Sequence, residues 1–334
     1  MREFVVTTDV ATARSFLGFF LLIFGLPAVF CPAYAQEKAD AATSACVPSD
    51  LAAVIVSEGH TVEIGEFNEE FKGKAKRSTR MATSDAVLAS QDDRQKENTY
   101  SVVLKEARKG NPAAMVNVGV FSLAGWGTQS NAGAALYWLH AAADRGYKPA
   151  FYDLGILYFK GCGVKRDEVE AFHFFKLGAA AGHAAAQVDL GYFFERGLGT
   201  AQDHAAAAHW YRQAAEAGEA QAQFNLADLY LRGEGVPEDE AAAFGWFQKA
   251  AFQGHTGAQI MAGCMLFAGR GAPKDLPGAY FWIFAAVSEG DDRGIPTLRA
   301  LESQMARVEI EEARARAESF TAAHKAISDV ALSH

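Results

Sequence analysis

Six glycines stand 36 residues apart along this chain, with no insertion or deletion between them: Gly110, Gly146, Gly182, Gly218, Gly254 and Gly290. Other columns keep the same step. A Gly-x-Gly pair starts at Gly125, Gly161, Gly197, Gly233 and Gly269. A bulky aromatic column consists of Trp138, Phe174, Trp210, Trp246 and Trp282. A period of this length indicates a stack of structural units, each too small to bury its apolar face alone. Five full units therefore run from about Gly110 to Gly290.

Each half of a unit has the apolar period of an α-helix. In the second half, apolar or small residues recur at offsets of 0, 3, 4, 7 and 8, as in Ala207, Trp210, Tyr211, Ala214 and Ala215. That spacing places one apolar stripe along a helix. The first half behaves likewise, as in Ala222, Leu226 and Tyr230. The sequence predicts an all-α solenoid with two helices of roughly 12 to 15 residues in each unit. It also predicts that Trp210 and Trp246 are buried between helices.

The glycine columns predict where the helices end. Gly146 and its equivalents follow the last apolar residue of the second helix, and the first glycine of each Gly-x-Gly pair follows the first helix. Glycine adopts the left-handed backbone conformation that ends a helix without steric strain. We therefore expect one such cap after every helix of the array.

The fourth unit carries the clearest family signature. The residues from Ala222 to Tyr230, the turn from Gly233 to Pro237, and the residues from Trp246 to Ala251 resemble the Sel1-like repeat, a 36-residue relative of the tetratricopeptide repeat. The resemblance covers roughly 180 of the 334 residues. It implies a right-handed α-solenoid whose concave face binds a peptide or protein, and it implies no chemistry of its own.

The two ends of the array differ from the repeats. Residues 99–292 form the predicted solenoid, in which Tyr100 to Lys109 is the second helix of an incomplete unit that caps the N-terminal end. Within residues 293–334 we predict two capping helices, from Ile295 to Met305 and from Val308 to Ile327. Residues 36–98 are polar and show no helical period. We expect a flexible leader there, because one apolar patch buries too little surface to offset the chain entropy.

The N-terminus predicts export. Residues 15–30 form an apolar stretch preceded by Arg2 and Arg14, and Ala33-Tyr34-Ala35 offers small residues at both recognition positions of a signal peptidase. The length of the stretch and its small-residue end favour a cleaved secretory signal over a membrane span. We expect processing after Ala35, a periplasmic or secreted protein, and no integral membrane span after cleavage. Retention of the signal as an anchor stays open.

The net charge limits the classes of binding partner, and the positions of the cysteines limit the possible disulfides. The formal net charge is −9, which argues against nucleic acid and against a basic membrane-surface mode. Processing after Ala35 would leave Cys46, Cys162 and Cys264. The last two lie three units apart, too far to bridge each other. A pairing of Cys46 with Cys162 stays open.

No motif indicates catalysis or metal binding. The chain has no His-x-x-x-His or Cys-x-x-Cys spacing for zinc, and no Ser-x-x-Lys or Gly-x-Ser-x-Gly arrangement for an activated serine. We therefore predict no catalytic, cofactor-binding or metal-binding residues.

A polar column marks the candidate binding face. Asn117, Asp153, Asp189 and Asn225 share one position of the first helix, and Met261 breaks the column. Asn and Asp are poor residues for a helix interior because their side chains compete for the backbone. Four at one position predict hydrogen bonds, either to the next helix or to the backbone of a guest peptide.

A basic column runs beside the polar one. Lys160, Arg196 and Arg232 come seven residues later, on nearly the same face. The helix dipole alone also favours a cation at this last turn. The resemblance places the first helix on the concave face, where Tyr192 and Asp228 would flank the same groove.

The leading hypothesis is a non-enzymatic periplasmic scaffold or regulator that binds a protein or peptide of the cell envelope through this groove. The alternative is an envelope hydrolase, or a protein that binds peptidoglycan or β-lactams, with a site assembled across repeats. Hydrolysis of such a substrate by the purified protein would favour the alternative.

Overall fold

The structure is a computed structural model that describes residues 85–333, with side chains described for residues 94–326. Over that range it contains thirteen α-helices, one 3-10 helix and no strand. Five helix pairs form units 1 to 5, and each pair packs closely together. This confirms the predicted all-α solenoid of two-helix repeats.

The first helices of the five units are α6 (Pro112–Ala124), α8 (Lys148–Lys160), α10 (Ala184–Arg196), α12 (Ala220–Arg232) and α14 (Thr256–Ala268). The second helices are α7 (Ala132–Ala143), α9 (Glu168–Ala180), α11 (His204–Glu216), α13 (Glu240–Phe252) and α15 (Leu276–Ser288). Before them comes α5 (Asp85–Arg108), and after them come η2 (Asp292–Gly294), α16 (Ile295–Glu302) and α17 (Arg307–Ser333).

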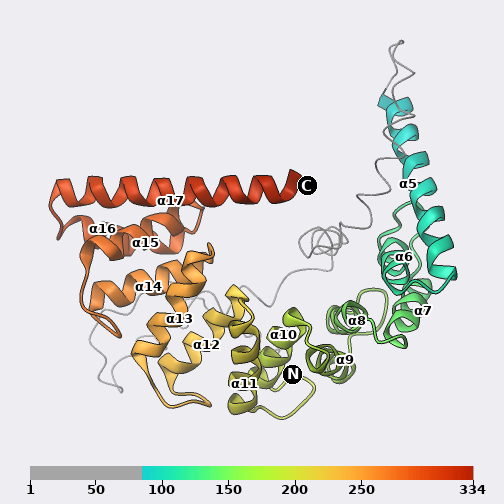
Figure 1. Cartoon of the computed structure of the whole chain (residues 1–334), viewed down its shortest axis with the longest axis horizontal. Helices are drawn as coiled ribbons and strands as arrows, with labels where there is room; N and C mark the ends of the chain where they lie inside the picture. Colours follow the sequence, from blue (N-terminus) through green and yellow to red (C-terminus); the bar gives the residue numbers. More distant parts are fainter. Residues whose placement is uncertain (1–84, 334) are drawn as a thin grey trace, which may run out of the picture.

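The units follow one another along an arc (Figure 1). Helices α6, α8 and α10 lie on the inner side of the arc, and α7, α9 and α11 lie on its outer side. Each first helix packs against the second helix of its own unit and against the second helix of the preceding unit. Its uncovered side therefore faces the inside of the arc.

Side-chain and glycine caps define the helix ends. An Asn or Asp side chain accepts a hydrogen bond from the first turn of every second helix, at Asn131, Asp167, Asp203, Asp239 and Asp275. These caps occupy one repeat column and satisfy backbone N–H groups that the helix leaves unpaired. Every first helix ends at a glycine in the left-handed conformation. The predicted glycine caps are thus confirmed for the first helices, and Gly146 and its equivalents also have positive φ.

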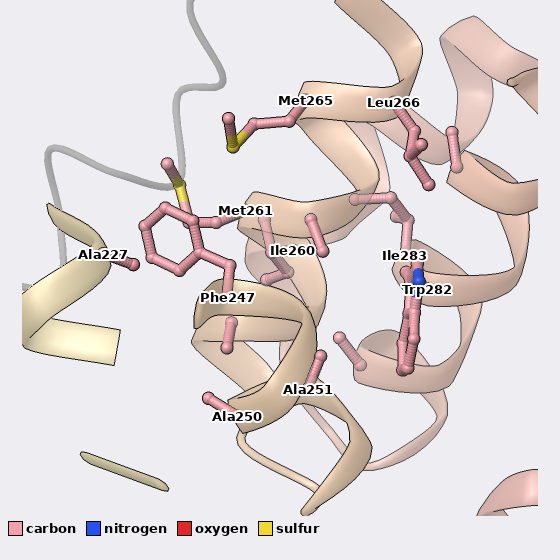
Figure 2. Packing of buried hydrophobic residues seen from close by; sticks show 14 of the residues in the cluster. Ala227, Phe247, Ala250, Ala251, Ile260, Met261, Met265, Leu266, Trp282 and Ile283 are labelled. Atoms are coloured by element: carbon pink, nitrogen blue, oxygen red, sulfur yellow. The ribbon is translucent and has the colours of Figure 1, made fainter. Parts of the chain in front are cut away.

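The core follows a column of large side chains on the second helices: Leu139, Phe175, Tyr211, Phe247 and Ile283, each at most 1 % exposed. They pack on a column of small residues on the first helix of the same unit. A Cβ atom at Gly191, for example, would lie 2.6 Å from the ring of Tyr211. Figure 2 shows Phe247 and Ile283 within the core of the last two units.

The predicted burial of Trp210 and Trp246 is wrong. Both are only partly buried, and the fully buried residue of each helix is the next one along the chain, Tyr211 or Phe247. The reason lies on the first helix, where Gly191 and Ala227 leave room for the later residue and not for the tryptophan. Trp246 instead carries the ammonium group of Lys249 at 3.7 Å from its ring centre.

Buried glutamines join consecutive units. Gln187, Gln223 and Gln259 occupy one repeat column, and each donates a hydrogen bond from Nε2 to a carbonyl oxygen near the end of the preceding second helix, at Ala179, Ala215 and Ala251. A buried polar side chain is tolerated when it is hydrogen-bonded. This column therefore fixes each first helix against the unit before it.

The ends of the array are helical caps. Helix α17 packs along α15, with Ala313 and Ala317 buried and Ala323 exposed. At the other end, α5 begins at Asp85, inside the stretch expected to be a flexible leader. Val87 and Leu88 lie in its first turn, but residues 90–98 are all polar, so no apolar period continues through them, although Gln, Lys and Glu favour helix. The rest of the expected leader, the signal segment and Cys46 lie outside the described residues.

Both cysteines of the described segment, Cys162 and Cys264, are disulfide-bonded. Cys46, which the sequence left open as a partner of Cys162, lies outside the described residues. In the part of the chain that the structure describes, no helix is both long and apolar enough to cross a membrane.

Candidate partner-binding face

The side of each first helix that no second helix covers lies along the inside of the arc, although Val120, Asp228, Gly257 and Met261 on this side are buried. On α10 this face contains Ala185, Asp189, Tyr192 and Arg196, which are spaced by four, three and four residues; the first three are partly buried and Arg196 is exposed. We call the four equivalent positions of units 1 to 5 the inner stripe. Asn117, Asp153 and Asn225 lie on it as well and are partly buried.

Asp153, Asp189 and Asn225 of the inner stripe already interact with other groups of the molecule. Asp189 accepts a hydrogen bond from Tyr152 of the preceding first helix, and Asn225 Oδ1 accepts one of 2.9 Å from Gln221. Burial raises the pKa of Asp189 to about 7, against the opposing effects of Tyr152 and Lys160. Asp189 therefore connects two units and carries only part of a negative charge at neutral pH.

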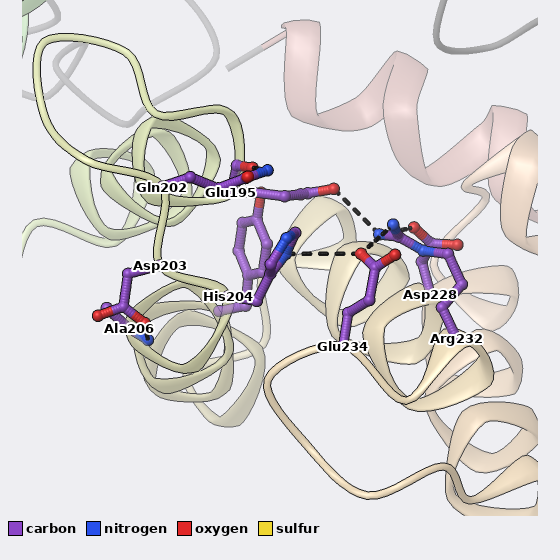
Figure 3. A network of polar contacts seen from close by, with 9 residues as sticks. Glu195, Gln202, Asp203, His204, Ala206, Asp228, Arg232 and Glu234 are labelled. Carbon is purple, nitrogen blue, oxygen red and sulfur yellow. Dashed lines mark hydrogen bonds and ion pairs between the residues drawn. The ribbon is translucent and has the colours of Figure 1, made fainter.

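Arg232 lies at the centre of a charged cluster between units 3 and 4 (Figure 3). Its Nη2 atom lies 3.0 Å from Glu195 Oε1 and 2.6 Å from Asp228 Oδ2. Its Nη1 atom donates to Glu234, which also faces His204. Three carboxylates from α10, α12 and the turn after α12 thus surround one guanidinium group.

The cluster is partly desolvated. The side chains of Glu195 and Asp228 are only 10 % and 6 % exposed. Burial raises the pKa of Asp228 to about 6, although Arg232 lowers it. Glu195 also accepts a hydrogen bond of 3.0 Å from the Tyr211 hydroxyl, and burial together with Glu195 raises the pKa of Tyr211. The cluster therefore ties the core of unit 3 to unit 4.

Arg232 and Asp228 thus differ from the role that the sequence suggested. We expected both to border an open groove, whereas Asp228 is buried and Arg232 is held by three carboxylates. The sequence did not single out Glu195 or Glu234. A comparison of repeat columns would have found them, because the two preceding units carry apolar residues at both positions.

Lys160 and Arg196 have a different environment from Arg232. Both are exposed, and neither forms an ion pair among the side chains that the structure describes. The guanidinium carbon of Arg196 lies 5.8 Å from the centre of the Tyr192 ring, a cation–π arrangement. Of the three predicted cations, these two are available to a ligand.

Two histidines that the sequence left unassigned act as helix caps. Nδ1 of His183 accepts a hydrogen bond from the backbone of Ala186, and Nδ1 of His255 accepts one from Ala258. The ring proton of His255 is therefore on Nε2, which lies 3.2 Å from Gln221 Oε1. Burial lowers the pKa of His255 to about 4, so the ring stays neutral at physiological pH. These rings have a structural role.

Two hollows on the surface of the described residues are shallow and open. Lys165 to Glu168 line one, and Thr256 with Glu289 to Arg293 line the other. No group of three or more His, Cys, Asp or Glu side chains within residues 94–326 is arranged to hold a metal ion.

Comparison with known proteins assigns the family. The model of the Sel1 repeat matches five times, at residues 112–147, 149–183, 184–219, 220–255 and 256–291. No curated protein matches the chain. The solved structure of c5321, a protective antigen present in uropathogenic Escherichia coli strains, is 29 % identical with a TM-score of 0.62 and covers 66 % of this chain. A Sel1 repeat protein from Oxalobacter formigenes is 33 % identical with a TM-score of 0.55 and covers 60 % of this chain.

This chain spans 48 % of the first of these proteins and 58 % of the second. The five matches together cover more than half of its residues, in the same register as the five helix pairs. The chain belongs to the Sel1 repeat family.

Proposed function

We propose that this protein is a non-enzymatic scaffold or regulator that binds another protein of the cell envelope along its inner stripe. The Sel1-repeat fold is commonly a scaffold for protein–protein interaction, and its members are generally not enzymes. The observation that carries the proposal is the uncovered inner face of the first helices, with polar side chains at one register in four consecutive units. A curved strip of this kind suits an extended segment or a loop of a partner.

The location in the envelope rests on the sequence. Residues 15–35 combine an apolar stretch with a signal-peptidase site, as argued above. Removal of that segment would release the solenoid on the far side of the inner membrane. The partner would then be a periplasmic protein or an exposed loop of a membrane protein.

A triple substitution in the inner stripe tests the proposal. Asp153→Ala/Asp189→Ala/Asn225→Ala is expected to abolish crosslinking of the partner in the envelope fraction, because the backbone N–H groups of an extended partner segment lose their hydrogen-bond acceptors. The fold is expected to remain, because alanine is the better helix former and none of the three residues belongs to the apolar core. Crosslinked partner is quantified by mass spectrometry, and helix content by circular dichroism.

The control is an equal number of exposed residues on the outer helices, His173→Ala/Lys176→Ala/His209→Ala, which should leave crosslinking unchanged. Normal crosslinking by the inner triple variant would place the binding face elsewhere. Unfolding of the inner triple variant would instead show that these side chains serve to hold the units together.

A further inference from the structure

One register of the inner stripe carries a cation in three consecutive units. Lys160, Arg196 and Arg232 each occupy the last residue of a first helix, directly before its glycine cap. Because the three positions are equivalent by the 36-residue repeat, the surroundings of one can be compared directly with those of the others.

In unit 4, carboxylates of the protein itself bind the cation at this position. Arg232 binds Asp228 four residues earlier, Glu195 in the last turn of the preceding first helix, and Glu234 two residues later. The molecule thus supplies every anion that this guanidinium group contacts. The position is closed to a ligand.

Units 2 and 3 lack all three carboxylates. Around Arg196 the equivalent positions are Tyr192, Phe159 and Leu198, and around Lys160 they are Ile156, Leu123 and Cys162. All but Cys162 are partly buried, so they offer apolar surface beside each cation. The acidic neighbours on the stripe are Asp153, which has a partner within the molecule, and Asp189, which is bonded to Tyr152.

We infer that Lys160 and Arg196 bind carboxylates of an acidic, partly apolar segment of the partner, which lies extended across units 2 and 3. This inference rests on the proposed function and names the chemistry of the ligand. The Tyr192 ring orients the Arg196 guanidinium, which has N–H groups left for two parallel hydrogen bonds to a carboxylate. The apolar side chains around both cations exclude water from the contact and pack against apolar residues of the segment.

The repeat also sets the spacing of the carboxylates. Side chains of consecutive first helices reach each other, as in the ion pair of Glu195 and Arg232, so equivalent residues of neighbouring units are separated by about one helix diameter, roughly 10 to 12 Å. An extended polyproline-II segment rises about 3.1 Å per residue and returns to the same face after three residues. A segment with acidic residues at positions i and i+3 therefore fits the two cations.

Three synthetic peptides of one length test the inference. Each has blocked ends and leucines between two probe positions three residues apart, which hold Glu in the first peptide, Gln in the second and Lys in the third. Fluorescence anisotropy with the full-length processed protein measures binding at low and at physiological ionic strength. The Glu peptide should bind at least about tenfold more tightly than the other two, and salt should weaken its binding.

Two protein variants distinguish binding at Lys160 and Arg196 from a general effect of the protein's net charge. Lys160→Gln/Arg196→Gln should reduce affinity for the Glu peptide about tenfold or more and leave the Gln peptide unaffected. Tyr192→Asp recreates the Asp228–Arg232 pair of unit 4 one unit earlier, so it should weaken binding while both cations remain. The control Lys176→Gln/Lys325→Gln removes two exposed cations outside the inner stripe and should change nothing.

Equal binding of the Glu and Gln peptides would overturn the inference, as would an equal loss with the control variant. If no peptide binds but the inner triple variant still loses its partner, the acidic ligand is wrong and the proposed function stands. If the triple variant also keeps its partner, both fail.

Discussion

Replacing Phe247 by alanine is expected to lower the free energy of unfolding by about 3 to 5 kcal/mol, the range for emptying a large buried aromatic site. Phe247 is fully buried, and its ring lies 5.4 Å from that of Phe224. It belongs to the core cluster that units 4 and 5 share with α17. Because coupling in a solenoid is between nearest neighbours, the loss should loosen α12 to α15 before it affects α6 to α9.

Chemical denaturation gives the free energy for this variant, and hydrogen exchange locates the loosened helices. The neighbouring change Trp246→Ala is the control. It should cost clearly less, about 1 to 2 kcal/mol, because that ring is only partly buried. A larger effect for Trp246 than for Phe247 would show that the packing described above is wrong.

Replacing Arg232 by methionine should lower the free energy of unfolding by about 3 kcal/mol at pH 8, since removal of one partner leaves buried carboxylates without compensation. The Met side chain keeps much of the volume, so the effect reports the charge. Arg196→Met removes the same side chain from the same register one unit earlier. It should change stability by no more than about 0.5 kcal/mol, because no ion pair is lost.

The cost of losing Arg232 should depend on pH. Without the guanidinium, the folded-state pKa of Asp228 should rise further above its present value of about 6. The folded variant then binds protons more readily than the unfolded chain, so its deficit shrinks as the pH falls from 8 towards 5. Denaturation at several pH values measures this. A deficit that stays constant or grows at low pH would contradict an electrostatic origin.

The sequence predicted the fold well because the repeat makes its local signals redundant. Five copies of the Gly-x-Gly turn and of the apolar stripe fixed the number of helices, their ends and their pairing. The sequence could not decide between Trp246 and Phe247, which lie side by side on the same apolar stripe. That choice depends on the small residue of the facing helix, Ala227, which is a tertiary contact.

The polar face was harder to predict because equivalent positions have different surroundings. Arg196 and Arg232 look the same in a repeat alignment, yet only Arg232 meets Glu195, Asp228 and Glu234. These carboxylates come from two units, so no local pattern reveals them together. The sequence also did not predict the buried glutamine column, for another reason. Gln187, Gln223 and Gln259 look like ordinary surface residues until their burial is known.

Site-specific photocrosslinking in the native host, with one probe on each side of the arc, tests whether the partner binds the inner face. Gln221 is exposed on the inner stripe of α12, and Val169 is 63 % exposed on the outer helix α9. A photoreactive residue at position 221 should give a discrete covalent adduct with an envelope protein, and one at position 169 should give none. Adducts of equal yield at both positions, or an adduct at position 169 alone, would contradict binding through the inner face.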